Sequence, residues 1–326
     1  MQQPEFTAEA YADELAALFP DSRTNAAVAI AAVDEQRTST AARGQCPADA
    51  RFEIGSITKT MTATLLASLM ADGVLGLDDD IERWIPAAAG KGLTLQALAT
   101  HTSGLHRLAR NQTLAALIHP RNPYVRFTAK QAEKGLRAVP NAAAATGRAA
   151  HVYSNFGYQL LGLALERASG QTYQQLLEAR ITGPLDMTST GVGRAGNGTT
   201  IPGHANGRPV PHWDQPLPGA GGVESTIADM ARYLAACAQP AQDALGAAIR
   251  LAQQPRLTAA EGKVIGLGWV RWNGRMIWHN GQTGGFCSSL AVDPGSGRGL
   301  VLLASSTSGS GAALDQRIIR LVRDGR

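Results

Sequence analysis

The 326-residue sequence predicts a mixed α/β (α+β) fold, in which an antiparallel sheet formed by N- and C-terminal segments is flanked by helices and carries an inserted, mainly helical lobe. Residues 25–33 form a short continuous apolar run, which is typical of a buried strand. Near the end of the chain, strand-like runs alternate with the turn signals NG, GQTGG and PGSGRG, which favour antiparallel pairing. Helical periodicity dominates between the two ends, and this predicts a helical insertion.

The N-terminal part of the chain alternates between helix and strand signals. Apolar residues at helical spacing predict a helix within 5–19, and the apolar run at 25–33 follows as a strand. A second strand-like stretch, 51–54, runs directly into a glycine. The next segment, 56–72, is predicted to be a helix that ends at Gly73.

The middle of the chain is predicted to consist of helices joined by loops. Helices are expected at 93–105, which runs into a Ser-Gly turn, at 154–170, which ends at a glycine, and at 225–238, which opens with a Ser-Thr cap. The stretch NAAAATG, which begins at Asn141, is predicted to be helix or loop rather than a linker. Residues 191–222 are rich in Gly and Pro and predict a long surface loop.

The C-terminal part is predicted to form the strands of the sheet and a last helix. Strands are expected within 264–272, 275–280, 286–293 and 298–305, and an amphipathic helix within 311–324. We therefore expect one domain, 1–326, with a sheet lobe from 1–55 and 245–326 and a mainly helical lobe from 56–244.

The composition excludes several classes of protein. Hydrophobic residues make up 44% and charged residues 17%, the net charge is +4, and no five like charges follow one another, so neither a nucleic-acid nor a membrane-binding patch is predicted. No apolar run reaches the length of a membrane span. The three cysteines are widely spaced without a CxxC, which argues against a disulfide framework and a zinc ribbon but leaves one disulfide open. No signal peptide is visible, so we expect a cytoplasmic protein if the chain is complete and a periplasmic or secreted one if a leader was removed.

The stretch RFEIGSITKT holds a possible nucleophile at the start of a predicted helix. Ser56 and Lys59 are three residues apart, so a helix places them on one face. Free backbone N–H groups at a helix N-terminus favour a developing oxyanion. Taken alone, the pair is better explained by a helix cap and a solvated lysine.

Two later tripeptides change this balance. Tyr153-Ser154-Asn155 opens the predicted 154–170 helix, and His279-Asn280-Gly281 ends a strand-like run. The patterns SxxK, YxN and HxG each occur once, in this order. With these motifs the sequence resembles the serine β-lactamase and penicillin-binding-protein superfamily, and within it the branch of class C β-lactamases, D-stereospecific peptidases and related esterases. The resemblance covers nearly the whole chain.

The resemblance implies a role for each residue of the first two motifs. Ser56 would be the acylated nucleophile, activated by Lys59 and Tyr153. The ammonium of Lys59 would favour the phenolate of Tyr153, although which of the two is the main base stays open. Asn155 would orient Lys59 and contact the substrate amide. The alternative for Asn155 is that it caps the helix.

The third motif would lie on an edge strand that lines the cleft. The oxyanion hole would consist of the backbone N–H groups of Ser56 and Gln282, and Gly281 would let the substrate approach the backbone. His279 and Asn280 replace the lysine and threonine of the KTG motif, and a histidine is only partly protonated near pH 7. This weakens the usual carboxylate anchor and favours an ester, a D-amino-acid peptide or an uncharged substrate over efficient β-lactam hydrolysis.

Other polar and aromatic residues are candidates for the pocket wall or for a metal. Asn122, Tyr124 and Phe286 are predicted to border the pocket, with Trp213 as a further wall candidate. Two loop histidines, His204 and His212, have Asp214 nearby, but their spacing is not that of a zinc site, so no metal or cofactor is predicted.

The sequence therefore predicts a serine acyl-hydrolase that forms an acyl-enzyme on Ser56 and acts on a small molecule, either a β-lactam or a D-amino-acid amide. A carboxylesterase acting on small acyl esters is the first alternative. The second is a weakly hydrolytic penicillin-binding protein, and a metallohydrolase is the least favoured. The oligomeric state is left open.

Overall fold

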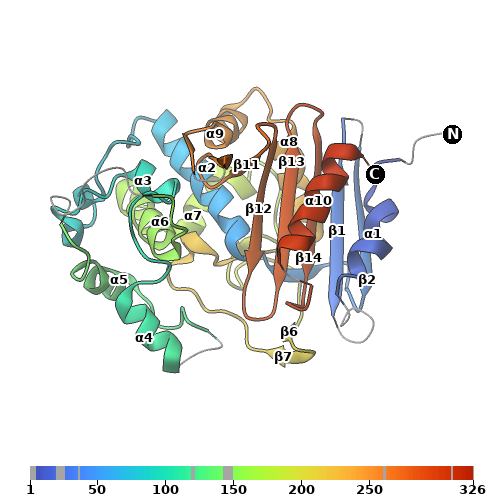
Figure 1. The fold of residues 1–326 in the computed structure, drawn as a ribbon, viewed down its shortest axis with the longest axis horizontal. Helices are drawn as coiled ribbons and strands as arrows, with labels where there is room; N and C mark the ends of the chain where they lie inside the picture. Colours follow the sequence, from blue (N-terminus) through green and yellow to red (C-terminus); the bar gives the residue numbers. More distant parts are fainter. Residues whose placement is uncertain are drawn as a thin grey trace.

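A large antiparallel sheet brings the two ends of the chain together. The computed structural model describes residues 5–19, 26–35, 37–118, 122–141, 150–259, 262–309 and 311–325. Within these residues the main sheet has eight strands in the order β2-β1-β14-β13-β12-β11-β10-β9 (Figure 1). They are β1 (Ala27–Val33), β2 (Thr38–Gly44), β9 (Leu257–Thr258), β10 (Val264–Ile265), β11 (Val270–Trp272), β12 (Met276–Gln282), β13 (Cys287–Asp293) and β14 (Arg298–Ala304). The predicted sheet of N- and C-terminal segments is confirmed, since β1 pairs with β14.

Helices cover both faces of this sheet. On one face lie α1 (Ala8–Ala16) and α10 (Ala312–Asp324), and on the other lies α8 (Ile227–Ala238) (Figure 1). The side chains of β1 alternate between two hydrophobic clusters, with Ile30 in one and Ala31 in the other. Because both faces are buried, this strand is an unbroken apolar run rather than an alternating one.

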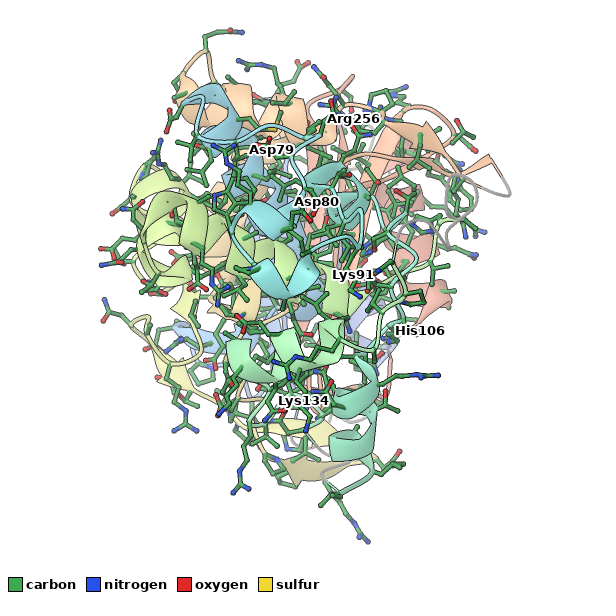
Figure 2. All side chains as sticks on the ribbon, turned by 90° about the vertical axis from the view of Figure 1, so that its left-hand side faces the viewer. Asp79, Asp80, Lys91, His106, Lys134 and Arg256 are labelled. Carbon is green, nitrogen blue, oxygen red and sulfur yellow. The ribbon has the colours of Figure 1, made fainter. Side chains whose placement is uncertain are left out.

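The helical part of the molecule is organised around α2 (Thr58–Ala71). This helix contacts both α6 (Asn155–Ser169) and α9 (Ala244–Gln253), and most of its side chains are buried, so it lacks a polar face. The remaining α-helices are α3 (Leu95–Ala99), α4 (Arg110–Ile118), α5 (Ala129–Leu136) and α7 (Tyr173–Leu177), the last of which continues into a π-helical turn. Figure 2 looks onto this end of the molecule, where acidic Asp79 and Asp80 and basic Lys91 and Lys134 share one face.

A small second sheet carries the chain toward α2. Its order is β4-β8-β3-β5, with β3 (Ala50–Glu53) antiparallel to β8 (Val223–Ser225). The two outer strands, β4 (Gly191–Val192) and β5 (Thr199–Thr200), come from the region predicted to be one long loop. That loop prediction was wrong in part, because the same region also holds the hairpin of β6 (Gly203–Ala205) and β7 (Arg208–Val210).

Other segments also differ from the prediction. The helix expected at 93–105 spans only Leu95–Ala99, because His101 adopts a positive φ of 59° that ends it. The edge strand β2 and the helix α9 were not predicted. Within NAAAATG, residues 142–147 lie outside the described part of the chain.

The division into two lobes stays a prediction, and α8, although it falls within 56–244, lies on the main sheet. Among the helices that the structure describes, none has the length and apolar character needed to cross a membrane.

Candidate active site

Ser56 lies in a tight turn between β3 and α2. Gly55 has a φ of +51°, and a 3-10 turn, Gly55–Ile57, leads into the helix. A Cβ atom on Gly55 would lie 2.7 Å from the backbone nitrogen of Gln282, so glycine is required both by the positive φ and by this close contact. The side chain of Ser56 caps neither this turn nor α2, which excludes the alternative of a simple N-cap.

Lys59 follows one turn later and is completely buried. Its Nζ lies 2.9 Å from Ser56 Oγ and donates to the carbonyl of Ala220 at 2.5 Å. Burial lowers the pKa of Lys59 well below its ordinary value, and the nearby charge of Arg107 lowers it further. No carboxylate in the described residues forms an ion pair with Lys59, so the neutral amine is favoured. The alternative of a solvated surface lysine was wrong.

Tyr153 completes the group around the nucleophile. Lys59 Nζ lies 4.9 Å from the centre of the tyrosine ring. Burial raises the pKa of Tyr153 above its ordinary value, more than the nearby Ser56 hydroxyl lowers it. The expectation that a Lys59 cation holds Tyr153 as a phenolate was therefore wrong for this arrangement, because desolvation disfavours both charges.

Asn155 turns toward the pocket wall instead of toward Lys59. Its Nδ2 donates to the hydroxyl of Tyr124 at 2.6 Å, and its buried Oδ1 has no hydrogen-bond partner. The expected bond to Lys59 is absent, since the bonds of that amine go to Ser56 and Ala220. Ser154, whose side chain accepts from the backbone of Gly157, caps α6, so the capping alternative for Asn155 was also wrong.

The third motif lies inside strand β12. This strand pairs with β13 from Ile277 to Gln282 but with β11 only over Met276–Trp278, so it is an interior strand whose last residues have a free edge. A Cβ on Gly281 would lie 2.1 Å from the carbonyl oxygen of Ile54. Glycine is thus required by the Ser56-bearing chain itself, rather than by an approaching substrate as we expected.

His279 is buried and uncharged in this strand. Its Nδ1 lies 2.6 Å from the Asn280 carbonyl, so Nδ1 carries the hydrogen. Burial is the main cause that lowers the pKa of His279, to about 3. The histidine therefore supplies no cation near pH 7, a stronger departure from a KTG lysine than partial protonation.

A cavity of about 310 Å³ opens onto the nucleophile. Its walls combine residues of the three motifs with residues from five other segments: Gly55, Ser56, Arg107, Tyr124, Tyr153, Asn155, Trp213, Gln215, Ala220, Gly221, Asn280, Gly281, Gln282, Cys287, Ser288, Gly311, Leu314 and Asp315. The structure thus brings most of the predicted site residues together around one space.

Four of the predicted residues lie outside this lining, and one of them is Lys59, which is buried with its Nζ 2.9 Å from Ser56 Oγ. Phe286 is buried against Phe52, with ring centres 6.3 Å apart, and belongs to the hydrophobic core. Asn122 accepts from the backbone of Tyr124 and so shapes the loop that presents this tyrosine. His279 lies behind the wall, in the strand.

Sequence reasoning missed Arg107, Gln215 and Asp315. Arg107 follows the THTSGL segment and lies 5.5 Å from the ring centre of Tyr153. An aspartate in the first turn of a helix, as Asp315 is, is already explained by the helix dipole, so its position gave no signal.

A separate group of charges could be mistaken for a metal centre. One atom each of Glu53, His212 and Glu224 lies within 4.8 Å of the others. However, His212 Nδ1 is already bonded to Glu53 at 2.9 Å, and Arg51 lies 3.2 Å from Glu224. The predicted absence of a metal stays a prediction. The three cysteines are free.

The sequence and the fold of the chain are similar to those of known proteins. The chain is 32% identical over 278 residues to the D-alanyl-D-alanine-carboxypeptidase/endopeptidase AmpH of Escherichia coli (strain K12), covering 76% of this chain and 68% of that protein. It is 28% identical over 311 residues to a beta-lactamase of the same strain, covering 81% and 78%. A solved mutant of a class C beta-lactamase matches its fold with a TM-score of 0.80 at 20% identity, over 98% of this chain and 97% of that one. The family model described as Beta-lactamase matches residues 10–324, and the chain therefore belongs to the beta-lactamase family of serine hydrolases.

Proposed function

We propose that the chain hydrolyses the amide bond of a D-amino-acid derivative or β-lactam through an acyl-enzyme on Ser56. One observation carries this proposal: a buried lysine amine, which has no ion-pair partner among the described residues, lies 2.9 Å from the serine hydroxyl. A serine hydroxyl is a weak nucleophile unless an adjacent base takes its proton. The names of the relatives, a carboxypeptidase/endopeptidase and a beta-lactamase, support the same class of bond.

In the first step Lys59 acts as the base. Because Nζ donates one hydrogen to the Ala220 carbonyl, its lone pair can face Ser56 Oγ. Oγ gives its proton to Nζ and attacks the carbonyl carbon of the substrate. The burial that lowers the pKa of Lys59 keeps the amine ready to accept that proton.

The tetrahedral intermediate would be stabilised by the backbone N–H groups of Ser56 and Gln282. The close approach of Gly55 to the Gln282 nitrogen supports this placement, because it puts that nitrogen next to the turn that carries Ser56. When the intermediate collapses, the bond to the leaving group breaks. Tyr153 gives its hydroxyl proton to that group and takes one back from the Lys59 ammonium. Water then hydrolyses the ester on Ser56.

A carboxylesterase is the second candidate, and the uncharged His279 favours it. A substrate carboxylate next to β12 would meet no cation from this motif, since the pKa of His279 is lowered to about 3. A neutral ester places no such demand on the site. A weakly hydrolytic penicillin-binding protein would share the acylation step and fail in the last one.

The proposal is tested by intact mass spectrometry after treatment with a fluorophosphonate and with a β-lactam. We expect one adduct on the native protein and on a Ser68→Ala control, which changes another serine of α2, and none on Ser56→Ala. Nitrocefin, D-Ala-D-Ala peptides and p-nitrophenyl esters then separate the substrate classes. Equal labelling of Ser56→Ala, or no labelling of the native protein, would overturn the proposal.

A further inference from the structure

Asp315 differs from the other buried acidic residues of the described chain. Five acidic side chains are buried there, and four form an ion pair: Glu53 with His212, Glu224 with Arg51, Asp229 with Arg232, and Asp293 with Arg275. Asp315, only 6% exposed, forms none. A buried carboxylate without a counter-charge is costly, and burial raises the pKa of Asp315 more than its hydrogen bonds to Ser289 and Asn280 lower it. A bound cation would relieve this cost.

The carboxylate is held in place by neutral groups only. One oxygen of Asp315 accepts from the hydroxyl of Ser289 at 2.7 Å, and the other accepts from Nδ2 of Asn280 at 2.7 Å. Each oxygen keeps a second lone pair. The bond also fixes the Asn280 amide, whose Nδ2 is committed and whose Oδ1 is left as an acceptor. Asp315 and Asn280 both line the cavity of Ser56.

This wall of the cavity therefore presents acceptors and negative charge. The neighbouring histidine of the third motif is uncharged. The one cation among the described lining residues, Arg107, lies beside Tyr153 instead. A substrate carboxylate at the Asp315 wall would be repelled, whereas a cationic donor would receive a charge-assisted hydrogen bond.

We infer that the cavity takes substrates that carry a protonated amine, and that Asp315, with Asn280 Oδ1, binds this ammonium group. The inference rests on the proposed acylation of Ser56 and adds the chemical class of the group recognised next to it. The ammonium belongs either to the acyl part or to the leaving group of the substrate. Asp315 is then a binding residue that sets specificity. The substrate ammonium supplies the positive charge that the carboxylate of Asp315 otherwise lacks.

The test uses fluorophosphonates, which label the serine whatever the natural substrate is. Each set contains three probes of equal length, which end in an ammonium, a methyl or a carboxylate group. The set is repeated with linkers of two to six methylenes, placed on either the P-alkyl or the P-alkoxy arm. In the native protein we expect the ammonium probe to label at least about 10-fold faster than the methyl probe, and the carboxylate probe to be slowest. The arm that shows the preference assigns the amine to the acyl part or to the leaving group.

Two variants separate charge from shape. Asp315→Asn keeps the size of the side chain and should abolish the ammonium preference, so that the ammonium and methyl probes label at similar rates. Ser289→Ala removes one hydrogen bond of Asp315 but keeps its charge, and should keep the preference. Thermal unfolding of each variant checks that it is folded. Labelling without any ammonium preference, or a preference that survives Asp315→Asn, overturns this inference alone, whereas absence of labelling by every probe overturns the proposed function as well.

Discussion

Among the described residues, buried ionisable side chains are paired with each other in the second sheet but lack ion-pair partners in the cleft. Beside β3, Arg51 and Glu224 are both almost fully buried and are paired with each other, and His212 pairs with Glu53. In the cleft, Lys59 and Asp315 are also buried, yet neither has an ion-pair partner in the described chain. A paired charge stabilises its surroundings only in its native geometry, whereas an unpaired one keeps its capacity to bind or to transfer a proton. The difference separates the charges of the scaffold from those of the site.

The largest effect is expected from Lys59→Met, which replaces the unpaired amine by an apolar chain of similar length. Activity toward a p-nitrophenyl ester should fall roughly 10⁴-fold, because Ser56 loses its base. Stability at pH 7 should not fall. The lowered folded-state pKa of Lys59 means that the unfolded chain binds the proton more tightly, so removing the group removes a cost. Kinetics and urea denaturation measure the two quantities, with Lys134→Met as the surface control (Figure 2). A large loss of stability would place Lys59 with the scaffold charges.

Arg51→Met should give the opposite result. It leaves Glu224 buried and unpaired, and it also removes the bonds from Arg51 to the carbonyls of Gly193 and Gly196. We expect the free energy of unfolding to fall by about 3–5 kcal/mol, with Ser56 in the folded protein still labelled by a fluorophosphonate. A second change, Glu224→Gln, should restore part of the loss. If Arg51→Met is as stable as the native protein, the comparison between the two regions fails.

Gly281→Ala tests the contact between the chain that carries Ser56 and strand β12. The new Cβ would lie 2.1 Å from the Ile54 carbonyl and 2.4 Å from Ser288 Oγ, so the two segments must separate. We expect a loss of about 1–3 kcal/mol in stability and a slower acylation, because the Gln282 nitrogen moves away from Oγ. Gly76→Ala, whose nearest neighbour would be 3.9 Å away, is the control and should change neither. Unfolding midpoints and labelling rates of both variants check this, and an unaffected Gly281→Ala would contradict it.

The sequence predicted best those elements whose residue pattern has a single physical explanation. Strand β1 was found because burial on both faces requires an unbroken apolar run, and β2 was missed because its side chains lie mostly exposed at the sheet edge. The two- and three-residue strands of the second sheet are too short to show a period. Their pairing is decided by tertiary contacts with β3 and β8.

The site divides in a similar way. Ser56, Lys59 and Tyr153 belong to short motifs, so spacing and order were enough to propose them. Their protonation was not predictable, because it depends on burial by segments far away in the chain. The role of Asp315 could not be predicted for the same reason. It depends on there being no cation next to the carboxylate among the described residues, and the sequence does not show which residues surround a side chain.

The smallest effect is expected from the pH dependence of the His212–Glu53 pair. The hydrogen bond to Glu53 raises the pKa of His212 above its ordinary 6.5, although burial acts against it. A raised folded-state pKa means that the stabilisation is complete below the unfolded value and is lost as the pH rises through the folded one. His212→Asn keeps a donor for Glu53 but does not titrate. The native protein should therefore lose stability relative to this variant as the pH rises through the raised pKa of His212, measured by urea denaturation at a series of pH values. If the difference in unfolding free energy between the native protein and His212→Asn does not change with pH, His212 and Glu53 do not form a charge pair. Buried charges without a partner would then also occur outside the cleft.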